Sequence, residues 1–507
     1  MAFGKRWVLA IVVMSACSSS SLTTPPPPST TTSVTTETFA GNHDLDVLFV
    51  IDDSPEMLAM QEKLQGQMAT FFSLLESSPT GLPNLHVGVV STDMGAPGDA
   101  AAGTDGCTAS GDGGQLLAAP QATCATTLAP GSTFVSDVGD VANFTDQIGN
   151  VLQCMIGLGQ AGCGFEQPLA ALDRALGADG LGPPPAQNAG FLRADADLAI
   201  IILTNEDDCS APAGTTLFSL NGAPESLQNP LGPLANYRCN QWGHLCKDPT
   251  AADPNQYAMP PLNPPADAQT VGNVPRLDLV DCKDNDQGTG LLTPVSKFVN
   301  DIKALKTDPD NHIYVSAISG SAVPYTVQWA PGFNQVSPAT ELWPEVMHVC
   351  GPAGASGVNP ASTMLTTDGS FADPAVRVAE FANAFRNSSL TSICSPDYSP
   401  AFSLLSSSTV GTIPPCVTGQ IQTDAAGQPI CTVIDEVTIG QTTTTFPVPA
   451  CDDSGEPAPC YILAPAPGLC DGMTVEVNET HVNLNADRLQ RTIACSICVP
   501  GSTAPGC

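Results

Sequence analysis

The chain has 507 residues and a formal net charge of −34, because 50 acidic residues stand against 16 Lys and Arg. Such a surface disfavours nucleic acid and anionic lipid headgroups, so we expect no nucleic-acid partner, and it favours cations and basic partners. The length is ample for one large or two ordinary domains.

The first residues have the pattern of an export signal. Two cationic residues precede an apolar stretch from Trp7 to Met14 that is too short to span a bilayer, which is typical of a signal peptide over residues 1–16. The stretch from Met14 to Cys17 resembles the bacterial lipobox, which implies that Cys17 is lipidated and becomes the mature N-terminus. An ordinary secretory signal cut near Ala16 is the alternative. Ser18 replaces the Asp associated with inner-membrane retention, which favours the outer membrane.

The composition of residues 17–42 predicts a tether. Ser, Thr and Pro dominate this segment, and Pro25 to Pro28 favour the extended polyproline II conformation. We therefore expect a disordered spacer that holds the folded part off a membrane, with the lipid anchor as the only membrane contact.

The stretch from Asp46 to Leu75 organises the next part of the chain. Val47 to Ile51 form a short apolar run typical of a strand buried on both faces, as in a parallel sheet covered by helices. The polarity then changes at Asp52, and Ser54 is a good N-cap for a helix whose apolar residues recur at helical spacing. A turn of this kind, at the carboxyl end of a strand, is where open α/β sheets bind ligands.

Similar alternations follow along the chain and predict the fold class. Further strands are expected at Leu85–Ser91, Leu198–Leu203 and His312–Ile318, with helices between them. We therefore predict a doubly wound, mostly parallel α/β sheet over residues 43–408, interrupted by a Pro-, Asn- and Gly-rich insertion at residues 209–290.

The strand-to-helix turn resembles the metal-site loop of the von Willebrand factor type A (VWA) family. That family carries Asp-x-Ser-x-Ser, which Asp52 and Ser54 match, whereas Glu56 replaces the second Ser. Glu166 lies where the family has Thr, and Asn205 where it has Asp. The order of elements, with TNEDDCS after the strand ending at Leu203, also looks like cysteine-rich VWA lipoproteins of bacteria.

This resemblance implies a divalent cation, Ca²⁺ or Mg²⁺, at the carboxyl edge of the sheet. The predicted oxygen ligands are Asp52, Ser54, Glu56, Glu166 and Asp207. Three carboxylates around one ion would repel an acidic partner, so we expect a structural calcium and recognition by neighbouring loops. The alternative needs no metal: these residues then cap helices, favour a helix start, or form a solvated acidic turn.

The 19 cysteines indicate an oxidising compartment, and 18 remain for disulfides once Cys17 is assigned to lipid. We expect pairing within 107–394 and within 416–507 separately. The expected pairs are Cys107 with Cys124, Cys154 with Cys163, Cys350 with Cys394, and two bridges among Cys209, Cys239, Cys246 and Cys282. Residues 411–507 contain eight cysteines between short β-like runs and predict a small disulfide-stapled β module.

The sequence contains no HExxH, Walker or GxSxG motif, and we therefore expect no enzyme activity. The leading hypothesis is a cell-envelope lipoprotein whose VWA-like domain binds a protein or extracellular-matrix partner. A structural envelope lipoprotein with a degenerate, metal-free site is the alternative. A hydrolase using Asp52 and Glu166 as a carboxylate pair is the third reading. Periplasmic and surface orientations both remain open.

Overall fold

The computed structural model describes residues 30–40, 44–76, 82–96, 106–118, 128–139, 141–219, 227–266, 268–271, 274–331, 342–408, 416–425, 427–439, 442–451, 460–465, 472–478, 488–499, 501–502 and 504–507. The predicted signal peptide and the lipidation site Cys17 lie outside these residues. Within the described part of the chain, no helix is both long and apolar enough to cross a bilayer.

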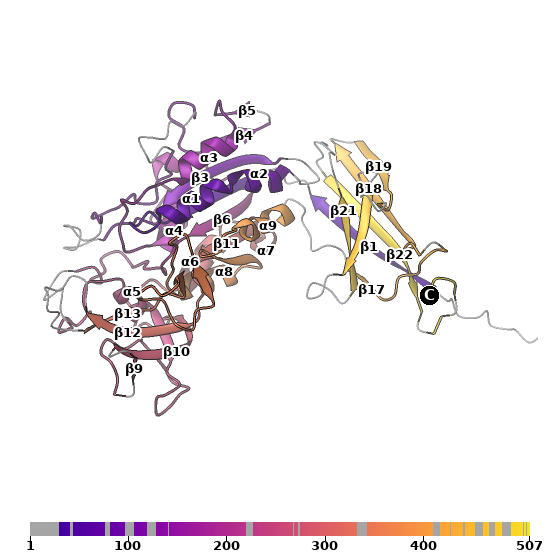
Figure 1. Cartoon of the computed structure of the whole chain (residues 1–507). Helices are drawn as coiled ribbons and strands as arrows, with labels where there is room; N and C mark the ends of the chain where they lie inside the picture. The colour runs from indigo at the N-terminus through magenta and orange to yellow at the C-terminus, as the bar shows by residue number, and fades with distance from the viewer. Residues whose placement is uncertain are drawn as a thin grey trace, which may run out of the picture.

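The largest sheet has seven strands in the order β16-β11-β6-β2-β3-β4-β5. Figure 1 labels β11, β6, β3, β4 and β5 of this sheet. Its strands are β2 (Asp44–Ile51), β3 (Asn84–Ser91), β4 (Val135–Val138), β5 (Val141–Ala142), β6 (Asp197–Leu203), β11 (Ile313–Ser319) and β16 (Asn387–Ser392). Every pair from β16 to β3 is parallel, whereas β4 and β5 are antiparallel. The sheet is therefore mixed.

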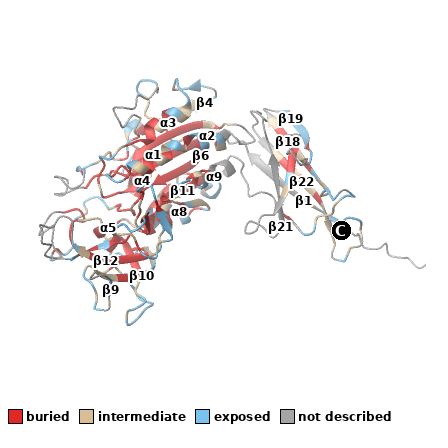
Figure 2. Ribbon diagram, viewed as in Figure 1, coloured by how far each residue is buried: buried red, intermediate tan, exposed pale blue. Residues whose placement is uncertain are grey.

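Helices cover both faces of this sheet, which explains why its central strands are apolar throughout (Figure 2). One face packs against α1 (Leu58–Gly66), α2 (Met68–Glu76), α3 (Ile148–Ile156) and α9 (Ser399–Ser408). The other face packs against α4 (Pro168–Leu176), α6 (Val295–Lys303) and α8 (Val376–Asn383). Successive residues of β2, such as Phe49 and Val50, point to opposite faces of the sheet and belong to the two different cores.

A second sheet is antiparallel and has six strands. It is formed by β7 (His244–Lys247), β8 (Tyr257–Ala258), β9 (Gln269–Val271), β10 (Val274–Asp284), β12 (Tyr325–Pro331) and β13 (Leu342–Val346). Four of these strands come from the predicted insertion, which also contains α5 (Tyr237–Gly243). The short α7 (Pro309–His312) precedes β11, and β14 (Cys350–Pro352) pairs in parallel with β15 (Met364–Thr366).

Two further sheets are formed by the C-terminal part of the chain together with the N-terminal strand β1. Strands β1 (Thr30–Ala40), β22 (Arg488–Cys498), β18 (Cys431–Ile439) and β19 (Thr442–Val448) form one, and β17 (Cys416–Thr418), β21 (Gly472–Asn478) and β20 (Cys460–Pro465) the other. A buried core that includes Val433, Tyr461 and Ile493 joins residues of both sheets. Arg491 forms a buried ion pair with Asp435 at 2.7 Å.

The predicted fold class is wrong for the chain. Strands account for 33% of the structure and helices for 19%, in antiparallel and mixed sheets rather than one doubly wound parallel α/β fold. The physical reason lies outside the central strands: the insertion pairs its own strands antiparallel, and β4 and β5 turn one edge of the main sheet antiparallel.

The predicted tether is also corrected in part. Its residues Thr30–Ala40 form β1, which pairs antiparallel with β22 along eleven residue pairs, from Thr30 opposite Cys498 to Ala40 opposite Arg488. Thr is β-branched and suits a strand once a partner edge is present. The N-terminal segment is therefore fastened to the C-terminal sheet.

The described residues contain seven disulfides, which are typical of an extracytoplasmic protein. They are Cys107–Cys163, Cys209–Cys239, Cys246–Cys282, Cys350–Cys394, Cys431–Cys495, Cys451–Cys460 and Cys498–Cys507. The two bridges of the insertion and the Cys350–Cys394 bridge confirm the prediction. Pairing of Cys107 with Cys124 and of Cys154 with Cys163 is wrong, because Cys163 is bonded to Cys107. None of the seven links the two predicted sets.

Candidate functional site: a buried acidic cluster at the sheet edge

Asp52 is the first residue after β2 and is fully buried. Its backbone N–H donates to the Leu203 carbonyl at 2.9 Å, which continues the pairing of β2 with β6 by one residue. One carboxylate oxygen accepts the Ser54 backbone N–H at 2.8 Å, and the other accepts the Thr204 hydroxyl at 2.9 Å. The carboxylate is thus fixed at the carboxyl ends of two neighbouring parallel strands.

Two glutamates join Asp52 from other loops. The carboxyl groups of Glu166, which precedes α4, and Glu206, which follows β6, lie close enough to share a proton. Glu206 is half-buried and accepts hydrogen bonds from the Asn236 amide at 2.6 and 2.8 Å. Because Asn236 belongs to the insertion, this contact fastens the insertion to the sheet edge.

Several buried polar atoms beside these carboxyl groups have no hydrogen-bond partner among the described residues. They are the Ser54 hydroxyl, Oε1 of Glu166, and both side-chain atoms of the Asn205 amide. All three residues are at most 2% exposed. We call Asp52, Ser54, Glu166, Asn205 and Glu206 the edge cluster. Unpaired buried polar atoms are costly, so their concentration at one place makes the edge cluster the candidate binding site.

Burial and mutual repulsion make the edge cluster prefer protons. Burial raises the pKa of Asp52. The pKa of Glu166 is raised well above its usual range by burial, and then by repulsion from Glu206 and Asp52. The pKa of Glu206 is raised by burial and then by repulsion from Asp373. Neighbouring carboxyl groups of this kind resist joint ionisation unless a cation is present.

The donors of the edge cluster fit a hard divalent cation. Carboxylate, hydroxyl and amide oxygens are the ligands that Ca²⁺ and Mg²⁺ take, and the unpaired oxygens of Ser54, Glu166 and Asn205 are available. Among the described residues, no three His, Cys, Asp or Glu side chains are already grouped as a metal site. A cation here would therefore have to draw on the hydroxyl and amide oxygens as well as the carboxylates.

The structure does not bring all five predicted ligands together. Asp52, Ser54 and Glu166 lie in the edge cluster, whereas Glu56 is exposed on the turn before α1. Asp207 is buried but points elsewhere: it accepts hydrogen bonds from the backbone N–H groups of Arg377 and Val378 and contacts His244 Nε2 at 2.8 Å. Burial acts to raise the pKa of Asp207, but these hydrogen bonds outweigh it and hold the pKa below the usual value.

Sequence reasoning chose Asp207 and missed Glu206. Asp207 and Asp208 both bond to Arg377, whereas Glu206 lies beside Glu166 and accepts from Asn236, so an error of one position exchanges a cluster carboxylate for a structural one. The usable signal was proximity, since Glu206 is the first acidic residue after the end of β6 at Leu203.

A second acidic group lies beside the edge cluster. Burial, together with repulsion from Asp52, Asp93 and Asp112, raises the pKa of Asp53 to about 8. Oδ1 of Asp53 is buried without a hydrogen-bond partner in the described structure. Asp93 and Asp112 are better satisfied, because Asp93 accepts the Gly95 N–H and Asp112 accepts the Ser91 hydroxyl.

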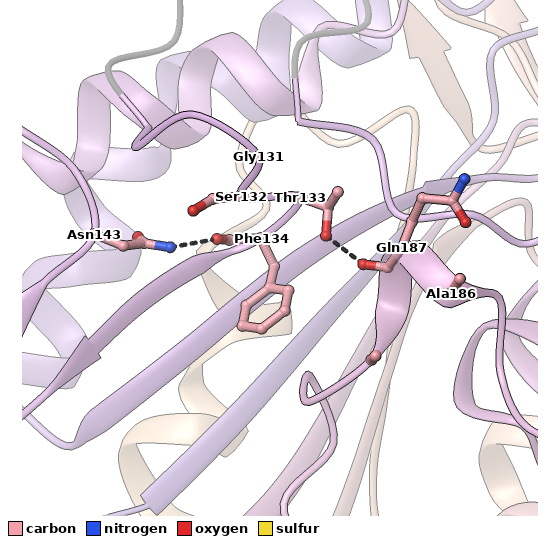
Figure 3. Close-up of a pocket in the computed structure, with 8 residues that line it drawn as sticks. Gly131, Ser132, Thr133, Phe134, Asn143, Ala186 and Gln187 are labelled. Atoms are coloured by element: carbon pink, nitrogen blue, oxygen red, sulfur yellow. Dashed lines mark hydrogen bonds between the residues drawn. The ribbon is translucent and has the colours of Figure 1, made fainter.

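An open pocket of about 390 Å³ lies elsewhere, between the loop before β4 and residues 186–189 (Figure 3). In it the Asn143 amide donates to the Phe134 carbonyl at 2.9 Å, and the Thr133 hydroxyl donates to the Gln187 carbonyl. None of its eight lining residues is titratable, so the pocket offers no acid, base or nucleophilic cysteine.

No protein-family model and no curated protein matches the chain. Among solved structures, it is similar to the pilus adhesin SpaC of Lactobacillus rhamnosus GG in an open conformation, with 10% identity, a TM-score of 0.28, and coverage of 91% of this chain and 40% of SpaC. The pilus adhesin RrgA of Streptococcus pneumoniae gives 10% identity, a TM-score of 0.28 and coverage of 92% and 58%.

The three N-terminal domains of the type V pili tip protein Mfa5 of Porphyromonas gingivalis give 10% identity, a TM-score of 0.23 and coverage of 93% and 68%. The chain thus spans 40% and 58% of the two adhesin chains. The structural neighbours are pilus proteins, but at these TM-scores the likeness decides neither the fold nor the function.

Proposed function

We propose that the protein is a non-catalytic binding protein held outside the cytoplasmic membrane, and that its edge cluster binds a structural calcium ion. The observation that carries this proposal is the set of buried, unpaired oxygens of Ser54, Glu166 and Asn205 beside the Asp52 carboxylate. A calcium ion supplies the positive charge and the coordination that these atoms otherwise lack.

Calcium is favoured over magnesium by the shape of the donor set. The donors come from three separate loops, which follow β2, precede α4 and follow β6. No single sequence motif therefore places them in a symmetric arrangement. Ca²⁺ accepts six to eight oxygens in flexible geometry, whereas Mg²⁺ demands a near-ideal octahedron. The ion would tie the three loops together, and through Asn236 also the insertion.

The partner would bind through the loops around the cluster rather than through the ion itself. An ion surrounded by Asp52, Glu166 and Glu206 retains little positive charge with which to recruit a carboxylate from a partner. The chain as a whole carries a charge of −34, which favours a partner with a basic surface. We propose a protein or extracellular-matrix ligand of this kind.

A metal-free structural role is the second candidate, and one observation favours it. Glu166 and Glu206 lie close enough for one proton to hold them together without any cation. In that case the cluster is a neutral hydrogen-bonded pair and calcium contributes nothing.

Calcium titration separates these candidates. Calorimetry and thermal unfolding of the full chain, first stripped with a chelator, should show calcium binding and a higher unfolding temperature. Asp52→Ala should abolish both effects, and Glu62→Gln, at an exposed position of α1 outside the cluster, should retain them. Binding to immobilised basic matrix proteins should then depend on calcium in the wild type and in the control variant, and calcium should not change it in Asp52→Ala. Absence of a calcium effect in the wild-type chain leaves the metal-free role.

A further inference from the structure

The antiparallel sheet carries a pocket that shares no residue with the edge cluster. It has a volume of about 680 Å³ and lies between β10, the start of β12 and residues 359–361. Its lining is mainly apolar and includes Val280, Val323, Pro324, Met347 and Pro360. Val280 and Val323 are 42% and 62% exposed, so the pocket opens to solvent. Its volume is in the range that binds small organic ligands.

One cation in this lining has no ion-pair partner in the part of the chain that the structure describes. Arg276 lies on β10 and is half-buried, and its Nε is buried with no hydrogen-bond partner among the described residues. Nor does any carboxylate of the described structure form an ion pair with it. In a chain with 50 acidic residues and 16 Lys and Arg, an unpaired guanidinium is unexpected. A guanidinium N–H withheld from water costs free energy until an acceptor arrives.

The two carboxylates of the pocket are already engaged. Asp278 accepts the Thr326 hydroxyl at 2.6 Å, and that hydroxyl in turn accepts the Asn359 amide at 2.7 Å. Asp281 pairs with Lys247 at 2.9 Å on the solvent side. Both carboxylates are therefore engaged by other groups, and neither forms an ion pair with Arg276 in the described structure.

A neutral donor and acceptor also lies beside Arg276. Gln269 on β9 stands opposite Arg276 in the antiparallel register and lines the same pocket. Its side chain is exposed and can accept or donate a hydrogen bond to a peptide group. The pocket thus combines a cation, an amide and an apolar surface.

We propose that this pocket binds the carboxyl terminus of a peptide whose last residue is apolar. The terminal carboxylate would pair with the Arg276 guanidinium in a charge-assisted contact. The last side chain would pack against Val280, Val323 and Pro324, and the preceding peptide group would bond to Gln269. This ligand matches all three chemical features at once, whereas a fatty acid would leave the amide unused. The proposal is independent of the calcium site.

The test uses the full chain and defined probes. N-acetyl-Leu-Leu with a free carboxylate should bind, and its carboxamide should bind about tenfold more weakly or less, because a hydrogen bond to a charged group is lost. Arg276→Gln should weaken binding of the acid by a similar factor and remove the preference over the carboxamide. Lys283→Gln removes a cation of β10 that pairs with Asp286 outside the pocket, and it should change affinity less than about twofold. Asp278→Asn removes a repelling charge and should strengthen binding.

The outcomes are separable. Matching thermal unfolding curves for the wild type and Arg276→Gln show that the variant is folded, and Arg276→Lys should recover part of the affinity. Equal binding of acid and carboxamide, an unchanged affinity in Arg276→Gln, or no binding at millimolar probe would overturn the proposal. Decanoate that binds more tightly than the peptide acid, with the same dependence on Arg276, would overturn the assignment of a peptide and identify a fatty-acid site.

Discussion

At the scale of single residues, the edge cluster contains interactions that lower the stability of the fold when no metal is bound. Asp52, Glu166 and Glu206 are carboxyl groups whose pKa values are raised by burial, and the buried oxygens of Ser54, Glu166 and Asn205 have no donor among the described residues. The folded protein therefore binds protons that the unfolded chain releases near neutral pH, so ionising these groups destabilises the fold. Bound at the proposed site, calcium would reverse this effect by favouring the charged carboxylates.

Glu166→Gln tests this at one side chain. In chelator-treated protein at neutral pH, the neutral amide avoids the repulsion from Glu206 and Asp52 and can donate a hydrogen bond to Glu206. We expect the free energy of unfolding to rise by about 1 kcal/mol in urea titrations. The same variant should lose stabilisation by calcium. A variant that is less stable without calcium, or equally stabilised by it, contradicts this role for Glu166.

Asp53 predicts a pH dependence. Because its pKa rises from 3.8 to about 8 on folding, the folded state holds a proton between these pH values that the unfolded state has lost. Stability should therefore fall as pH rises from about 4 to 8, by at most about 1.4 kcal/mol per pH unit from this group. Asp53→Asn should flatten the slope of unfolding free energy against pH in metal-free protein, and the exposed Glu56→Gln should not. An unchanged slope in Asp53→Asn is the contrary result.

At the scale of elements, buried charges connect the main sheet to the insertion. The Arg377 guanidinium of α8 bonds to Asp208 after β6 at 2.9 Å, to Asp284 at the end of β10, and to the Thr293 carbonyl at 2.7 Å. Asp207 contacts His244 at the start of β7. Acidic residues that resemble metal ligands in the sequence therefore join separate sheets.

Arg377→Met should be strongly destabilising. It leaves the Asp208 and Asp284 carboxylates buried without their cation, a loss that costs about 3–5 kcal/mol. Arg386→Met removes an exposed cation close to the C-terminal end of the same helix and should cost less than about 0.5 kcal/mol. Urea unfolding measures both. Equal stability of the two variants would show that the buried ion pairs do not hold the insertion in place.

Much of the central sheet could be predicted because its strands are continuous apolar runs. The expected strand Leu198–Leu203 corresponds to β6, and Leu85–Ser91 to β3, within one residue at each end. The antiparallel sheet was missed because its strands are not continuous apolar runs and most of them lie in a Pro-rich segment that has the composition of a loop. Leu277 and Leu279 of β10 do alternate with polar residues, which is a two-residue period typical of a half-buried strand.

Asp52, Ser54 and Glu166 could be placed in the site because each follows or precedes a predictable element. The partner of a strand cannot be read in the same way. The Thr-rich segment Thr30–Ala40 has the composition of a tether, and only the distant edge of β22 makes it a strand. Similarly, the Cys107–Cys163 bridge depends on the path of loops that carry no periodic pattern.

At the scale of the whole molecule, the chain combines a helix-covered mixed sheet, an antiparallel sheet and a disulfide-bonded C-terminal pair of sheets (Figure 1). The disulfides fit an oxidising compartment. We propose in addition that Cys17 carries lipid, since Met14 to Cys17 resemble a lipobox. With β1 beginning at Thr30, only a short spacer would separate the anchor from the C-terminal sheets.

Labelled palmitate checks the anchor in a bacterial host that processes lipoproteins. The wild-type chain should incorporate label and sediment with membranes, and Cys17→Ala should do neither. Cys154→Ala, which removes a disulfide cysteine instead, should still be labelled. Label in Cys17→Ala, or membrane association without label in the wild type, contradicts lipidation at this residue.

A crystal structure with calcium tests the central claim most directly. We predict an anomalous peak with oxygens of Asp52 and Glu166 at about 2.3–2.6 Å, and with Ser54 or Asn205 completing the coordination. The peak should be absent from crystals of Asp52→Ala. Glu166 and Glu206 joined by a hydrogen bond in saturating calcium, with no anomalous peak at the sheet edge, would contradict the claim that the edge cluster is a calcium site.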